Sequence, residues 1–147
     1  MNLEHYHYVS SNEHFDYEFY SEGPQGRINK IVTFTKIQDS PVIYNLAFGD
    51  KDSKTGLLDD LAITNNDDRN KVLATVANTI NDFCDHYGNH YIYAEGSTQA
   101  RTRLYQISIS ALLDEISTSF DVFGLKDDIL YRFQRNVNYD AFLVKRK

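Results

Sequence analysis

The chain has 147 residues, a formal net charge of −6, and a composition that is 41% hydrophobic and 14% aromatic. This apolar content excludes an intrinsically disordered chain, and the length predicts a single domain over residues 1–147. The acidic balance argues against general nucleic-acid binding, because affinity for phosphate backbones comes mainly from Lys and Arg. One cysteine, Cys84, excludes an intramolecular disulfide, and no apolar run is long enough to cross a bilayer, so we expect a cytoplasmic protein.

Four strands are predicted in the first part of the chain. Residues 15–20 alternate aromatic and acidic side chains, which is the period of a strand with one face in water. The turn residues of "EGPQG" separate them from a β-branched run at 27–37, so these two strands form a hairpin. One side of the second strand carries Ile28, Val32 and Phe34. Further strands are expected at 41–49 and 57–64.

The segment "GDKDSKTG" between the last two strands carries Asp50 and Asp52 at the spacing of calcium ligands. The rest of the calcium pattern fails, because Lys54 occupies the fifth position and Leu61 the twelfth, where a bidentate acid is needed. We therefore expect a plain hairpin loop.

Residues 64–89, "TNNDDRNKVLATVANTINDFCDHYGN", are predicted to form a long amphipathic helix. Asn66 or Asp67 is the expected N-cap, and Gly88 is expected to end the helix. Cys84 falls on the apolar stripe, which indicates a core residue rather than a reactive thiol. The stripe consists of Val72, Leu73, Val76, Ala77, Ile80, Phe83, Cys84 and Tyr87.

A short strand is predicted at 90–96, followed by a second helix from about Thr98 to Ser119. Its inward face is expected to consist of Leu104, Ile107, Ala111, Leu112 and Ile116. The chain closes with "FDVFGL", "ILYRFQRN" and "YDAFLVKRK", which are typical of strands joined by turns.

This order of elements predicts an α+β fold with a mixed, mainly antiparallel sheet and two long amphipathic helices. Sequential hairpins favour antiparallel neighbours. The first helix joins the fourth strand to the fifth, which favours a right-handed crossover into a parallel neighbour.

The stretch 93–106, "YAEGSTQARTRLYQ", is the strongest candidate for a binding site. A Gly-Ser-Thr turn opens the second helix, where free N–H groups and the positive end of the helix dipole attract anions. Arg101 lies one turn into the helix and can clamp a phosphate or carboxylate, with Tyr105 one turn further on the same face. The candidate ligand-binding residues are Gly96, Ser97, Thr98, Arg101, Arg103 and Tyr105.

The same stretch also has a purely structural interpretation, and the sequence leaves both open. Ser97 or Thr98 can serve simply as the N-cap of the helix. Arg101 and Arg103 can pair with nearby acids such as Glu95. A strand followed by Gly-Ser-Thr and a helix is common, and it is less specific than a Walker loop.

No other pattern predicts a metal or catalytic centre. His5 and His7 stand two apart on a possible strand, which places both on one face, but no third ligand has a fixed relation to them. His14, His86 and His90 are interpreted as surface or strand-end residues. We predict no metal, and the sequence identifies neither a cofactor nor a catalytic residue.

The order of elements resembles the acetyl-CoA-dependent N-acyltransferase (GNAT) fold, without the first two helices of that fold. In that family a glycine-rich loop holds the cofactor's pyrophosphate where the helix after the fourth strand begins. Here that position reads "TNNDDRNK", which has no glycine, and Asp67 and Asp68 would repel a pyrophosphate. The resemblance therefore supports a GNAT-like order of elements better than it supports binding of acetyl-CoA.

A second resemblance covers nearly the whole chain. The strings "YNLAFGD", "DRNKVLATVANTI", "GSTQARTRLYQ" and "NYDAFLVKRK" are similar to those of an uncharacterised family of small bacterial proteins, found mostly in Bacteroidota. The resemblance implies a cytoplasmic bacterial protein and assigns no activity.

Three functional hypotheses follow. The first is a domain that binds a phosphate-bearing small molecule, or another anion, where the second helix begins. The second is a non-catalytic protein-interaction module, such as one component of a bacterial two-gene stress or defence system, and the third is a GNAT-like acyltransferase. The interaction surface would use exposed tyrosines and the basic C-terminal region, and exposed sheet edges make a homodimer plausible. The basic residues of that region are Arg132, Arg135, Lys145, Arg146 and Lys147, against the single acid Asp140.

Overall fold

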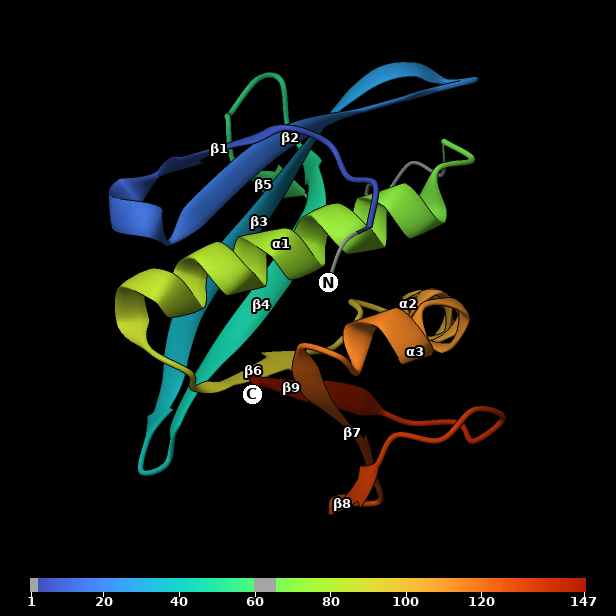
Figure 1. Ribbon diagram of the computed structural model, residues 1–147. Helices are drawn as coiled ribbons and strands as arrows, with labels where there is room; N and C mark the ends of the chain where they lie inside the picture. Colours follow the sequence, from blue (N-terminus) through green and yellow to red (C-terminus); the bar gives the residue numbers. More distant parts are fainter. Residues whose placement is uncertain (1–2, 60–65) are drawn as a thin grey trace.

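The computed structural model describes residues 3–59 and 66–147, and in these ranges nine strands form one sheet (Figure 1). The strands are β1 Tyr8–Ser11, β2 Asp16–Gly23, β3 Gly26–Asp39, β4 Val42–Lys51, β5 Leu58–Asp59, β6 Tyr91–Ala94, β7 Phe120–Lys126, β8 Ile129–Arg132 and β9 Ala141–Arg146. The helices are α1 Arg69–Tyr87, α2 Gln99–Ala111 and α3 Leu113–Ile116, with a short turn, η1, at Asn12–His14. No described helix has the length and apolar character that crossing a membrane requires.

The strands follow the order β1-β2-β3-β4-β6-β9-β7-β8, and β5 pairs with β4. Strands β1 to β4 pair antiparallel in sequence. Strands β4 and β6 pair in parallel, with Ile43 opposite Tyr91 and Asn45 opposite Tyr93. Strand β9 lies between β6 and β7 and is antiparallel to both. The predicted α+β fold with a mixed, mainly antiparallel sheet is confirmed, as is the parallel neighbour expected after α1.

Alternation along the first strands selects the side chains that lie under the helices. Tyr17, Val32 and Phe48 are opposite one another across β2, β3 and β4, and all three are buried. Their neighbours along each strand point to the other face, because side chains alternate in an extended chain. That face carries polar contacts such as the Glu18–Lys51 ion pair at 2.5 Å.

Helix α1 packs its apolar stripe on the centre of the sheet, as its sequence predicts. Phe83 is fully buried, and its ring stacks on Phe34 with centroids 4.2 Å apart and meets the edge of Tyr44 at 4.8 Å. Such ring pairs contribute about 0.5–1.5 kcal/mol each beyond the area they bury. Cys84 is buried beside Phe83, and burial raises the pKa of its thiol, as expected for a core residue. Gly88, at φ 99°, ends the helix as predicted.

The predicted start of α1 was wrong. The helix begins at Arg69, and Asp68 occupies the N-cap position without a capping hydrogen bond from its side chain. Asn66 is buried against the β2–β3 hairpin instead, where its Oδ1 accepts the Gln25 amide at 2.7 Å. A long-range contact therefore takes the side chain that local sequence assigned to the cap.

The second helix is shorter than predicted and turns a different face inward. It divides into α2 and α3. Leu104 and Ile107, both expected inside, are 43% and 49% exposed, and Ala111 is exposed as well. Leu112 is half-buried, and Ile116 is buried as expected.

Polar residues replace the missing apolar ones on the buried face of α2. Gln106 bridges to the segment before β9, because its Oε1 accepts the Tyr139 amide at 3.1 Å and its Nε2 donates to the Val137 carbonyl. These bonds offset the cost of burying an amide. Apolar spacing could not reveal this face, whose buried members are Thr102, Gln106, Ser108 and Ile109.

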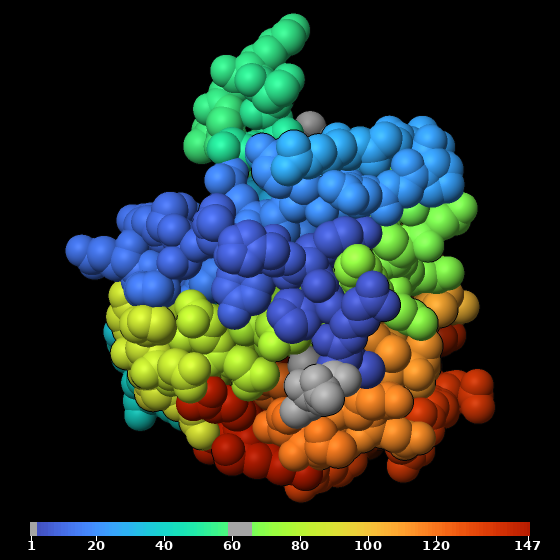
Figure 2. Space-filling view, turned by 45° about the horizontal axis from the view of Figure 1, so that its top comes forward, coloured from blue at the N-terminus to red at the C-terminus, as the bar shows by residue number. Residues whose placement is uncertain are grey.

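The β4–β5 connection is a hairpin loop, as the failed calcium pattern indicated. Asp52 Oδ1 accepts the amides of Lys54 and Thr55 at 2.7 and 3.1 Å, which closes the turn. The loop projects from the body of the molecule (Figure 2). Of the strand predicted at 57–64, β5 covers Leu58–Asp59, and residues 60–65 lie outside the described ranges.

The strand considered for His5 and His7 is absent, because residues 3–7 form no strand and β1 begins at Tyr8. This segment lies along α1 instead, where the Tyr6 amide donates to Thr75 Oγ1 at 2.9 Å.

Two isoleucines of α2 test the corrected helix face. Ile109 is 8% exposed, so Ile109→Ala is expected to lower the free energy of unfolding by about 2–4 kcal/mol. Ile107→Ala removes a side chain that is 49% exposed and should change it by no more than about 0.5 kcal/mol. Urea denaturation of both variants measures the difference, and equal losses would show that the assigned face is wrong.

Candidate functional site

The parallel pair β4 and β6 brings two helix N-termini to one edge of the sheet. Helix α1 ends at Tyr87, shortly before β6 begins at Tyr91, so α1 runs back along the sheet from the carboxyl ends of these strands. Helix α2 begins at Gln99, after β6 ends at Ala94. Figure 1 shows both helices on the same side of the sheet. Two positive dipole ends therefore lie near the carboxyl ends of parallel strands, a common place for ligand sites.

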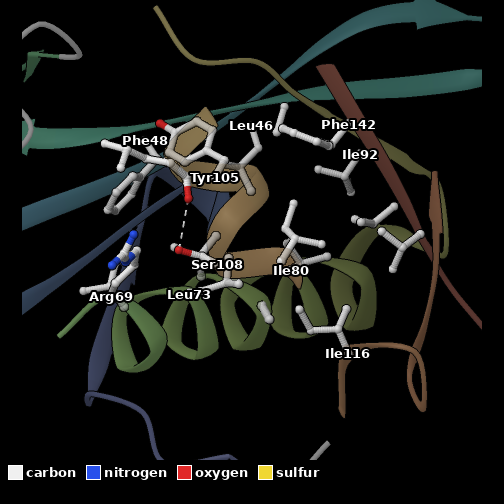
Figure 3. A pocket seen from close by; sticks show the side chains of 18 of the residues that line it. Leu46, Phe48, Arg69, Leu73, Ile80, Ile92, Tyr105, Ser108, Ile116 and Phe142 are labelled. Carbon is white, nitrogen blue, oxygen red and sulfur yellow. Dashed lines mark hydrogen bonds between the residues drawn. The ribbon is translucent and has the colours of Figure 1, made fainter. Parts of the chain in front are cut away.

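A cavity of about 190 Å³ lies between the sheet and helices α1 and α2 (Figure 3). Its body is apolar and receives side chains from strands on both sides of the parallel pair. Figure 3 shows Arg69 and Phe48 towards one end, and Ile116 and Phe142 towards the other. The apolar lining residues include Leu46, Phe48, Leu73, Val76, Ala77, Ile80, Ile92, Leu104, Ile109, Ile116, Phe120, Val122, Phe142 and Val144.

The charged lining residues are Lys30, Asp68, Arg69 and Arg101. Lys30 is 2% exposed, and its Nζ lies 2.5 Å from Asp50 Oδ1 and 5.9 Å from the centre of the Phe48 ring. It therefore belongs to the Phe48 end of the cavity, where α1 begins with Arg69. Arg69 is exposed, and in the ranges that the structure describes its side chain makes no ion pair.

The acid at this end is already satisfied by protein donors. Asp68 Oδ2 accepts the Tyr6 hydroxyl at 2.6 Å and the Ser21 hydroxyl at 2.5 Å. Burial, followed by the hydrogen bond to Asp68, raises the pKa of Tyr6, so this phenol stays a donor. Lys30 is paired with Asp50, and Arg69 and Arg101 add further positive charge to the cavity lining.

The predicted Gly-Ser-Thr turn forms at the start of α2. Thr98 is the N-cap, and its Oγ1 accepts the Arg101 amide at 3.2 Å. The Gly96 amide donates to Thr102 Oγ1 at 3.1 Å. A Cβ at Gly96 would lie 2.4 Å from the Thr102 nitrogen, so this close approach requires glycine. Two of the amides in this region are thus bound by the protein's own hydroxyls.

The other candidate residues separate into two groups. Arg101 and Tyr105 line the cavity, and Arg101 Nη1 donates to Ser97 Oγ at 2.7 Å. Arg103 is exposed and does not line the cavity. Glu95, the acid suggested as an arginine partner, accepts the Tyr93 hydroxyl at 2.7 Å.

Sequence reasoning missed Lys30, Arg69 and the cavity itself. Lys30 is in phase with Val32 and Phe34 along β3, so a lysine on the buried side of a strand was an available signal. No sequence pattern marked Arg69, because its place in the cavity lining depends on where α1 begins. The cavity arises from packing between distant segments, which periodicity does not describe.

The basic C-terminal side chains contact other parts of the fold. Arg146 Nη1 lies 2.6 Å from Asp85 Oδ1, and Lys147 Nζ donates to the Ser117 carbonyl at 2.6 Å. Lys145 Nζ lies 5.0 Å from the centre of the Tyr91 ring. These contacts give the residues structural roles, and a protein partner or homodimer stays a prediction.

Comparison with known proteins gives one match. The model of a family of unknown function, DUF6934, matches residues 2–147. No curated protein and no solved structure matches the chain. The predicted resemblance to an uncharacterised family is confirmed, while the resemblance to GNAT acyltransferases gains no support.

Tyr93, next to the α2 turn, gives a pH test of this region. Burial, then the hydrogen bond to Glu95, raises the pKa of Tyr93 to about 12. A phenol with a raised pKa stabilises the fold fully below its unfolded pKa of about 10 and loses this contribution as pH rises towards 12. Tyr93→Phe should therefore flatten the decline of the urea midpoint across this window, whereas the exposed-residue control Tyr131→Phe should not. An unchanged decline in Tyr93→Phe would contradict the assignment.

Proposed function

We propose, since the chain belongs to the DUF6934 family of unknown function, that it binds a small amphipathic anion, with the apolar part in the cavity and the anionic head at Arg101 and Arg69. The observation that carries the proposal is the shape of the site: an apolar cavity of about 190 Å³ ends at two arginines beside two helix N-termini. A purely polar anion would not fill the apolar cavity, and a purely apolar ligand would gain nothing from the positive charge of the arginines.

The size of the cavity sets the size of the apolar group. A cavity of roughly 150 Å³ lined by Leu, Ile and Phe can hold benzene. The cavity here, at about 190 Å³, is somewhat larger and has the same kind of lining. It therefore suits a short acyl chain or one aromatic ring.

The charges select a carboxylate or phosphate as the head group. Arg101 and Arg69 stand in the first turns of α2 and α1, where the helix dipoles add to their attraction for an anion. Gly96, Ser97 and Thr98 form the turn that holds Arg101 in place, since Ser97 accepts from its guanidinium and Thr98 caps its amide. In this proposal the head group lies at the start of α2, where the sequence predicts an anion. Tyr105 lines the cavity beside it, and Arg103 lies outside the cavity.

The hydrogen bond of the Ser108 hydroxyl in the cavity lining fits binding better than catalysis. Ser108 Oγ donates to the Leu104 carbonyl at 3.2 Å, the usual bond of a serine within a helix (Figure 3). A nucleophile would be expected to donate to a base instead.

A series of straight-chain carboxylates from butyrate to dodecanoate tests the match between ligand and cavity. Each methylene that enters the cavity should contribute about 0.8 kcal/mol, which is roughly a fourfold gain in affinity. We expect the gain to stop once the cavity is full, and isothermal titration calorimetry measures the break. Affinity that rises without a break, or no binding by any member, would contradict the proposal.

Arginine variants test the head group. Arg101→Ala removes a charge-assisted contact worth about 1.5–3 kcal/mol and should weaken octanoate binding by roughly 10- to 150-fold. Arg103→Ala, two residues along the same helix but outside the cavity, is the matched control and should bind octanoate normally.

Octanol separates the contribution of the charged head group to affinity from that of the alkyl chain in the same experiment. It carries no charge, so its affinity should be equal for the native protein and Arg101→Ala. The affinity of octyl phosphate, compared with that of octanoate, shows whether the site prefers a phosphate or a carboxylate head group. Equal effects of the Arg101 and Arg103 changes on octanoate would show that the anion is held elsewhere.

A further inference from the structure

Three potential metal ligands meet near the C-terminal end of α1, away from the arginine end of the cavity. His14 comes from η1, while Asp82 and His86 lie one turn apart on α1, and one donor atom of each lies within 4.8 Å of the others. His14 Nδ1 is 3.3 Å from Asp82 Oδ2. Ligand atoms around a tetrahedral ion with bonds of about 2.0–2.1 Å are roughly 3.3 Å apart. The donor atoms are therefore close enough for side-chain rotation to bring them to one ion.

We propose that His14, Asp82 and His86 bind a divalent transition-metal ion, for which Zn²⁺ is the best match. Two imidazoles and one carboxylate form a nitrogen–oxygen donor set that suits zinc, whereas Mg²⁺ and Ca²⁺ prefer oxygen ligands alone. The three side chains are 35%, 29% and 42% exposed, so a fourth position is open to water. Three protein ligands and an open position are typical of reactive rather than purely structural zinc sites.

A backbone contact indicates which ring nitrogen of His86 is available to an ion. Its Nδ1 lies 2.8 Å from the Asp82 carbonyl oxygen, which can only accept a hydrogen bond. Nδ1 therefore carries the proton, and Nε2 presents its lone pair. Metal-binding histidines commonly donate their other ring N–H to a carbonyl or carboxylate in this way.

A buried phenol supports Asp82 from the core. The Tyr17 hydroxyl donates to Asp82 Oδ2 at 2.7 Å, and Tyr17 is fully buried. Hydrogen bonds of this kind fix the orientation of metal-binding carboxylates.

The backbone that carries His14 is strained. Asn12, Glu13 and His14 have φ values of 51°, 56° and 68°, in the left-handed region. Such residues cost on the order of 1–3 kcal/mol and cluster at functional sites. The Tyr87 hydroxyl donates to the Glu13 carbonyl at 2.5 Å and holds the turn on α1. His14 Nδ1 is buried and, in the part of the chain described, makes no hydrogen bond; it lies 3.3 Å from Asp82 Oδ2, and an ion could bridge these two atoms.

Ion binding must open the contact between the two histidine rings. Their centroids lie 3.6 Å apart at an interplanar angle of 18°. A metal binds in the plane of an imidazole ring, along its nitrogen lone pair, so it cannot join two rings that remain stacked. His86 is exposed near the end of α1 and has space to turn. The imidazole proton resonances of both residues should therefore shift together when the ion binds.

Calorimetric titration of the untagged chain with Zn²⁺ tests the site. We expect one ion per chain, no binding of Mg²⁺, and joint NMR shifts of His14 and His86. Removal of an outer partner alone weakens metal binding by about 10–100-fold, so His14→Ala, His86→Ala and Asp82→Asn should each cost at least as much. His5→Ala is the matched control and should bind Zn²⁺ normally.

Tyr17→Phe gives a second measure, because it keeps the ring in the core and removes only the hydroxyl. It should weaken Zn²⁺ binding by about 10–100-fold while the circular dichroism spectrum is unchanged. The proposal is overturned if the native chain does not bind Zn²⁺, if His14→Ala binds it as tightly as the native chain, or if His5→Ala weakens it equally.

Discussion

The parallel pairing of β4 with β6 is the constraint on which the rest of the structure depends. Two parallel strands cannot be joined by a hairpin, so the chain must return across the sheet, and α1 makes that return. The return places the first turn of α1 beside the first turn of α2. Arg69 and Arg101 consequently lie at one edge, with the cavity between the two helices and the sheet.

Helix α1 then gives the molecule two chemically distinct ends. Its first turn contributes Arg69 to the cavity, and its last turns contribute Asp82 and His86 to a cluster with His14. Between the two ends, Phe83 packs on Phe34 and Tyr44 and so holds the helix on the sheet. A substitution that shifts α1 on the sheet would therefore disturb both ends, whereas a change at either end alone leaves the central contact intact.

Much of the fold could be predicted from sequence, because strand alternation and the stripe of α1 are local patterns. The face of α2 could not, since Gln106 and Thr102 are buried through hydrogen bonds and Ile107 is exposed. Of the side chains predicted to bind a ligand, Arg101 and Tyr105 line the cavity, whereas Arg103 is exposed outside it. Lys30 could have been recognised from its phase along β3, whereas His14 and Arg69 depend on contacts between segments far apart in the chain, which spacing does not describe.

Arg69, Arg101 and the cavity are proposed to act together on one ligand. A crystal structure of the chain with octanoate tests this proposal most directly. We expect the alkyl chain in the cavity between α1 and α2, with the carboxylate within hydrogen-bond distance of Arg101 or Arg69. Octanoate bound on another surface, or lying in the cavity with its carboxylate turned away from both arginines, would contradict it.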